Sequence, residues 1–269
     1  TGVPEVLSAS ASRALLGLSV GGFPRGCTIA NGADDEHDID IAAGWRYNVS
    51  AGLAMELASA QTREIDASFG AGNGGLFTGS VAADTTYHIF LIEKTSDGSI
   101  DVGFDTSITA ANIPAGYSNA ELIASVMTDG SSNIRQFHQS AERFYWKNFT
   151  VADWDTTNPG ASRVTEDVST PGGRVIEAMI SGFVIDSSSS TSYSLLITSL
   201  DQPDVDPGAV AINDAITATA GITNTAYKRT VRTNTSSEVG YRFNASNSDL
   251  RVSGRAVGWI DTLYAGVKV

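Results

Sequence analysis

The chain has 269 residues, of which 42% are hydrophobic, so it is long enough to bury one large core or two ordinary ones. Only 17% are charged, and Ser, Thr, Asn and Gly carry much of the polarity, which favours short strands joined by turns over long helices. The net charge of −13 repels phosphate backbones and anionic lipids, so we expect no nucleic acid partner and no membrane insertion.

The N-terminal segment 1–26 is rich in Ser, Ala and Gly, and we expect it to be a connector or stalk-proximal segment. Gly17-Leu18-Ser19-Val20-Gly21 matches the spacing of a hydrolase nucleophile elbow. That chemistry requires a helix directly after the serine, which Gly22 and Pro24 prevent. Cys27 is the single cysteine, so a disulfide framework is excluded and a small buried residue is expected.

Strand signals begin after Cys27 and continue through the first half of the chain. Asp38 to Ile41 alternate polar and apolar residues, which predicts a strand with one wet face. Residues 87–92 form an apolar run, followed by the turn Ser96-Asp97-Gly98 and an alternating return strand over 100–104, which together predict a hairpin. Residues 122–137 predict a second hairpin around Asp129-Gly130.

A linker closes this half. Asp155 to Gly160 contains Asn158-Pro159-Gly160, and we place the domain boundary there, giving a first β-sandwich over 27–156 and a second over 161–269. Further strands are expected over 175–185, 193–200, 223–233, 238–244 and 250–260. The predicted fold is therefore all-β, with two antiparallel, jelly-roll-like β-sandwich domains.

The densest acidic cluster is a candidate metal site. Asp34, Glu36, Asp38 and Asp40 offer the oxygen ligands that Ca²⁺ prefers, although the spacing of an EF-hand loop fails. A solvated strand edge is the expected role, since charges on edge strands also block aggregation. Calcium remains the alternative, and no other cofactor is indicated.

No catalytic constellation emerges, and we expect the protein not to be an enzyme. His37, His88 and His138 are far apart in sequence, and His88, which lies in an apolar strand, is expected to be a hydrogen-bonded core or strand-face residue. The segment Gly70–Gly75 fits a dinucleotide fingerprint by spacing, but no helix follows to bind a pyrophosphate.

Aromatic rings near loops or strand ends are the candidates for sugar binding, because an exposed ring stacks on the apolar face of a pyranose. These candidates are Trp45, Tyr47, Tyr117, Trp154, Tyr227 and Tyr241. A second aromatic set falls in a predicted strand, where packing in the core is expected instead: Phe144, Tyr145, Trp146 and Phe149.

Scattered segments across most of residues 28–262 resemble, in the same order, segments of tail-fibre, head-spike and other surface proteins of tailed phages, prophages and gene transfer agents. These segments are Asn31 with His37–Gly44, Thr86–Ile92, Asp101–Ser107, Ile113–Tyr117, Thr128–Gly130 with Asn133–Ile134, Phe144–Lys147, Arg232–Ser236 and Gly258–Asp261. One departure lies at Ser131-Ser132-Asn133, where the family's commoner turn has a glycine between Ser and Asn.

The resemblance implies a fibre or spike component on the surface of a virion or phage-like particle, used outside cells. It further implies a homo-oligomer, with a trimer favoured, other virion proteins as partners, and a host surface polysaccharide (capsule or lipopolysaccharide) as receptor. It supplies no catalytic residues. Two alternatives stay open: a purely structural fibre, adaptor or capsid-decoration protein, and a polysaccharide depolymerase, for which no internal repeat of the required period is seen.

Overall fold

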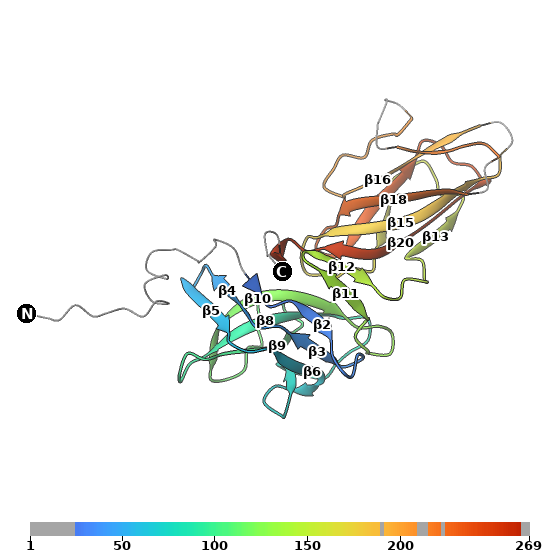
Figure 1. Ribbon diagram of the computed structural model, residues 1–269. Coiled ribbons are helices and arrows are strands. Elements are labelled where there is room, and N and C mark those ends of the chain that lie inside the picture. The colour runs from blue at the N-terminus through green and yellow to red at the C-terminus, as the bar shows by residue number, and fades with distance from the viewer. Residues whose placement is uncertain (1–24, 189–190, 209–214, 222–223, 265–269) are drawn as a thin grey trace, which may run out of the picture. The chain divides into compact units, whose positions relative to one another are not determined.

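The computed structural model describes residues 25–188, 191–208, 215–221 and 224–264 (Figure 1). This described part consists of β-strands and turns, with no α-helix and one short 3-10 turn, η1 (Thr262–Tyr264), so the expected all-β class is confirmed. No helix in it has the length and apolar character needed to cross a membrane. Of the expected connector, residues 1–24 lie outside the described residues, while Arg25–Gly26 form strand β1.

The chain divides into two compact units: among the described residues, the first comprises 25–134 together with Leu263 and Tyr264, and the second runs from Arg135 to Thr262. The first unit is built around a seven-stranded sheet in the order β10-β8-β9-β7-β6-β3-β2. All neighbours are antiparallel except β7, which is parallel to both β6 and β9. The strands are β2 (Ile29–Asn31), β3 (Asp38–Ile41), β6 (Gln61–Ser68), β7 (Gly74–Leu76), β8 (Thr86–Lys94), β9 (Ile100–Asp105) and β10 (Tyr117–Met127).

A smaller antiparallel sheet, β1-β4-β5, supplies the second layer, with β4 (Gly44–Asn48) contacting β10 and β5 (Leu53–Leu57) contacting β8 and β9. The other face of the large sheet is covered by a cluster around Phe90 and Ile92 that includes Phe69 and Phe77. Both faces of β8 are thus covered, which explains why residues 87–92 are all buried and show no alternation of buried and exposed positions.

Both predicted turns are present, but only the first joins two full strands into a hairpin. Gly98, with φ of 70°, closes the β8–β9 hairpin, and its N–H donates to the Lys94 carbonyl at 2.8 Å, so the first predicted hairpin is confirmed. At the second, the Asp129 carboxylate accepts the N–H groups of Ser131 and Asn133. Its return limb is only an isolated bridge between Thr128 and Ile134.

The second unit is a β-sandwich of two sheets (Figure 1). One sheet has the order β11-β12-β20-β15-β18, with β13 also paired to β20, and the other has the order β14-β19-β16-β17. The strands are β11 (Phe137–Ser140), β12 (Arg143–Trp146), β13 (Trp154–Thr157), β14 (Val164–Asp167), β15 (Glu177–Asp186), β16 (Tyr193–Thr198), β17 (Ile216–Ala218), β18 (Thr225–Arg232), β19 (Glu238–Phe243) and β20 (Leu250–Ile260). Side chains of both sheets form one core between them, including Leu195, Val239, Phe243 and Val252.

The division of the chain differs from the expected boundary at 155–160. Strands β11, β12 and β13 hydrogen-bond along the second unit's first sheet, and β12 and β13 both pair with β20. Residues 135–157 therefore belong to the second unit because their pairing partners do. The Asn158-Pro159-Gly160 segment is a loop between β13 and β14 inside that unit.

Candidate ligand-binding groove

The outward face of the second unit's six-stranded sheet is set by strand alternation. On β15, the side chains of Ala178 and Ile180 belong to the core. Because side chains alternate along a strand, those of Met179 and Ser181 lie on the outward face of the sheet. Strand pairing places Met179 opposite Gly258 on one side and Thr230 on the other. The same pairing extends the row through Gly258 to Tyr145 on β12.

A neighbouring row is built from charged and hydroxyl side chains. Ser181 lies opposite Arg255 on β20 and opposite Lys228 on β18. Between the two rows, β20 carries a bulge, because Met179 pairs with Gly258 and the next residue, Ile180, pairs with Ala256. The extra residue, Val257, turns half-exposed onto the surface.

A loop stands beside these rows where β12 ends and β13 begins, at residues 147–153. The Arg255 guanidinium holds the loop by donating to the carbonyl oxygens of Phe149, at 2.9 Å, and Thr150, at 3.2 Å. Its far end is fixed by the Asp153 carboxylate, which accepts the N–H of Ala256 at 2.6 Å and the hydroxyl of Ser169 at 2.6 Å. The ring of Phe149 is thereby carried on an anchored loop although it is 48% exposed.

Together these elements form an open groove of about 480 Å³ across the outward face of the sheet, which we call the sheet groove. Aromatic residues form one wall, β18 forms the other, and β15 and the bulge of β20 form the floor. It is lined by Tyr145, Trp146, Phe149, Met179, Ile180, Ser181, Lys228, Arg229, Thr230 and Val257. An apolar floor with exposed rings, hydroxyls and cations at its rim suits a ligand that has both an apolar face and polar groups.

Tyr145 and Phe149 were expected in the core, and the structure corrects this. On β12, Phe144 and Trp146 are buried while Tyr145 between them is 38% exposed. The buried pair packs on Trp259, whose ring centroid lies 4.7 Å from that of each. Strand alternation was the signal that would have separated Tyr145 from its neighbours.

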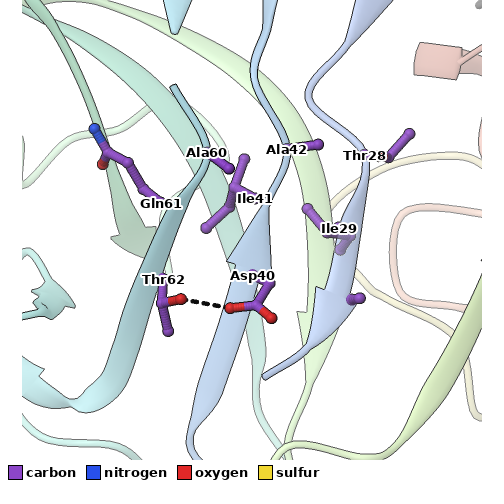
Figure 2. Close-up of a pocket in the computed structure, with 9 residues that line it drawn as sticks. Thr28, Ile29, Asp40, Ile41, Ala42, Ala60, Gln61 and Thr62 are labelled. Atoms are coloured by element: carbon purple, nitrogen blue, oxygen red, sulfur yellow. Dashed lines mark hydrogen bonds between the residues drawn. The ribbon is translucent and has the colours of Figure 1, made fainter. Parts of the chain in front are cut away.

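Two grooves in the first unit are lined without aromatic rings. One, of about 450 Å³, lies over β2, β3 and β6, and Figure 2 shows Asp40 and Thr62 facing each other across two of these strands. The Thr62 hydroxyl donates to the Asp40 carboxylate at 2.5 Å. The other, of about 310 Å³, lies between the β5–β6 turn and the β8–β9 turn. Small side chains such as Ala42, Ala60 and Ala58 offer little stacking surface there.

None of the six aromatic residues selected from the sequence lines any of these three grooves. Trp154, Tyr227 and Tyr241 are core residues of the second unit, exposed by 5% or less, which corrects their expected role. Trp154 stacks on Tyr241 with ring centroids 6.0 Å apart, and the Tyr227 hydroxyl donates to the Ser253 carbonyl at 2.9 Å. Their faces are covered by protein, so they stabilise the fold.

The other three rings lie in the first unit. Trp45 and Tyr47 share one face of β4, where Trp45 is half-buried and Tyr47 is 44% exposed. Tyr117 packs edge-on against Phe69, and its hydroxyl donates to the Asp101 carboxylate at 3.3 Å. Burial raises the pKa of the Tyr117 phenol. Ligand binding by these three rings stays a prediction.

The four candidate metal ligands divide between different roles. Asp34 and Glu36 gather with His37, with ligand atoms within 4.8 Å of one another in the β2–β3 turn. Asp38 accepts the Asp34 N–H at 3.2 Å, and Asp40 is bound to Thr62. A hydrogen bond from His37 lowers the pKa of Asp34, and the same bond raises the pKa of His37. These contacts build the turn, and calcium binding stays a prediction.

Two further residues with reactive side chains are buried. His88 is 2% exposed and its Nδ1 lies 2.8 Å from the Ser125 hydroxyl, so its expected role as a hydrogen-bonded core residue is confirmed. Cys27 is fully buried, and burial raises the pKa of its thiol. A buried thiol with a raised pKa is a poor nucleophile.

Comparison with known proteins identifies no family. No family model matches the chain, and no curated protein matches it significantly. Among solved structures, the T13 particle of infectious bursal disease virus gives a TM-score of 0.26 and 10% identity over 90% of this chain and 71% of that chain. The structure of the Gx strain of that virus gives a TM-score of 0.17 and 9% identity, over 86% of this chain and 70% of that chain. Similarity this weak supports no inference about fold or function.

Proposed function

We propose that this protein is a surface component of a phage-like particle and that it attaches to a host-cell surface glycan through the sheet groove. The particle assignment rests on the ordered sequence segments that resemble tail-fibre and spike proteins. The assignment to glycan binding rests on one structural observation, the exposed rings of Tyr145 and Phe149 at the rim of an open groove.

The groove offers the groups that a sugar requires. The apolar face of a pyranose stacks on an exposed aromatic ring, and Tyr145 presents such a ring. The Ser181 hydroxyl lies on the floor and the Thr230 hydroxyl lies on the wall opposite the aromatic rings. Both hydroxyls can exchange hydrogen bonds with the hydroxyls of a sugar. The rim is open to solvent, so a long polysaccharide passes through without needing a chain end.

Binding without hydrolysis is the activity that this groove supports best. Most glycoside hydrolases need a pair of carboxylates on either side of the scissile bond. No Asp or Glu is among the described residues that line the sheet groove. A depolymerase would therefore need another site.

An open groove of this kind gives weak affinity for each copy, so we propose that the protein acts as a homo-oligomer, with a trimer expected from the resemblance. Several linked grooves raise the avidity by about 10²–10⁴-fold without any new contact. Analytical ultracentrifugation of the purified protein tests the trimer, and a monomer at all concentrations would contradict it.

The proposal is tested by applying the purified protein to an array of bacterial capsular polysaccharides and lipopolysaccharides. We expect binding to a restricted set of glycans, with no release of reducing ends during incubation. Absence of binding across the array would contradict the proposal and favour a structural fibre or adaptor role. Release of reducing ends would contradict the non-enzymatic part and support a depolymerase.

A further inference from the structure

The charge of the sheet groove has the opposite sign to the charge of the chain. The sequence has 30 Asp and Glu against 17 Lys and Arg, so an average surface groove would be acidic. The lining of the sheet groove instead includes Lys228 and Arg229, and its described residues include no carboxylate. The groove therefore attracts anions more strongly than the rest of the surface, whose net negative charge repels them.

Four arginines of the second unit form ion pairs with aspartates. Arg251 forms an ion pair with Asp155 at 2.5 Å, and Arg242 forms one with Asp204 at 3.0 Å. Two more pairs are Arg174 with Asp261 and Arg232 with Asp201. These arginines therefore offer little net charge to a ligand.

Lys228 differs from these arginines. It is exposed on the outward face of β18, and among the described residues no carboxylate lies within ion-pair distance of its ammonium group. Across Ser181 in the same row lies Arg255, whose guanidinium donates to the uncharged carbonyl oxygens of Phe149 and Thr150. Carbonyl acceptors orient the guanidinium without cancelling its charge. The nearest acid along β15 is Glu177, which lies opposite Arg232, beyond the groove.

We propose that the glycan bound in the sheet groove is anionic and that Lys228 contacts its carboxylate or phosphate group; this inference rests on the proposed function. The sugar ring stacks on Tyr145, and its hydroxyls meet Ser181 and Thr230. The charged substituent then faces the β18 wall. An ammonium group donates hydrogen bonds to carboxylate and phosphate oxygens alike, so the two substituents share one recognition chemistry.

The experiment uses the full chain and the same array of bacterial polysaccharides, supplemented with charge-free counterparts of its acidic members. Uronic acid carboxylates are reduced to hydroxymethyl groups, and phosphate substituents are removed with hydrofluoric acid, which separates the two sources of charge. Binding is also measured for Lys228→Gln and for a matched control, Lys94→Gln, which alters an exposed lysine of the first unit.

We expect the wild-type protein to bind acidic glycans and to lose about tenfold in affinity when the charge is removed, as for a charge-assisted hydrogen bond. Lys228→Gln should weaken binding to the acidic form by a similar factor and leave binding to the charge-free form unchanged, while Lys94→Gln changes neither. Equal binding of acidic and charge-free forms would overturn the anionic inference and leave glycan attachment standing. Binding of neither form would overturn both.

Discussion

Tyr145 on β12 lies directly opposite Gly258 on β20, so its ring borders a position where the central strand carries no side chain. Glycine is required there by the packing of the backbone. A Cβ on Gly258 would lie 2.0 Å from the Phe144 carbonyl oxygen and 2.8 Å from Met179 Cε.

Gly258→Ala is therefore expected to force β12 away from β20. Overpacking of this kind lowers the free energy of unfolding by about 1–3 kcal/mol. The loss of stability is measured by urea unfolding monitored through tryptophan fluorescence, because Trp146, Trp154 and Trp259 all lie in the second unit. Gly160→Ala is the control, because a Cβ there meets no atom within 4 Å. Equal stability of both variants would contradict the close approach.

Tyr227→Phe tests the assignment of that ring to the core. The substitution keeps the buried ring but removes the hydroxyl that donates to the Ser253 carbonyl, so the free energy of unfolding should fall by about 1 kcal/mol. Tyr47→Phe, on an exposed ring of the first unit, should have no such effect. Glycan binding by Tyr227→Phe should match the wild type, and its loss at unchanged stability would return Tyr227 to the ligand site.

The pKa of His37 tests the turn that it forms with Asp34. Its hydrogen bond to Asp34 raises the pKa of His37 above the ordinary value of 6.5. A raised pKa means that the contribution of His37 to stability is present below pH 6.5 and is lost as the pH rises through the folded-state value. The lowered pKa of Asp34 sets the acid limit, since its contribution is lost as the pH falls through that value.

NMR titration of the His37 ring measures this directly. In Asp34→Asn the pKa of His37 should fall toward the ordinary value, whereas the matched variant Asp35→Asn should shift it less, because Asp34 supplies the hydrogen bond. An unchanged His37 pKa in Asp34→Asn would contradict the hydrogen bond between His37 and Asp34.

Cys27 is expected to be unreactive in the folded protein. It is fully buried, and a raised pKa keeps the thiol protonated at neutral pH. A chromogenic disulfide reagent should modify it only after unfolding in urea. Rapid modification of the native protein would show that β1 and β4 open readily around it.

Local strand patterns predicted much of the fold. The all-β class and the strands of the second unit over 175–185, 193–200 and 250–260 follow from apolar runs between turn residues, and each is present in the structure. The division of the chain could not be predicted in the same way. Residues 135–157 join the second unit through pairing with β20, a partner about a hundred residues away, and no local signal marks such a pairing.

The candidate site was harder to predict than the fold. Tyr145 sits in an aromatic run that suggests burial, and only the direction of its strand relative to the core shows that its ring faces outward. Trp154 and Tyr241 lie near turn residues, yet they stack inside the sandwich. A sequence gives the alternation of a strand, but the face that meets solvent depends on how the two sheets pack.

Glycan-array binding by Tyr145→Ala and Tyr47→Ala tests the central claim most directly. Both substitutions remove an exposed tyrosine ring, one from the sheet groove and one from the first unit. We expect Tyr145→Ala to weaken binding by about three- to tenfold, the effect of losing one stacked ring, and Tyr47→Ala to bind like the wild type. Unchanged binding by Tyr145→Ala together with loss in Tyr47→Ala would contradict the sheet groove and place the glycan site on the first unit.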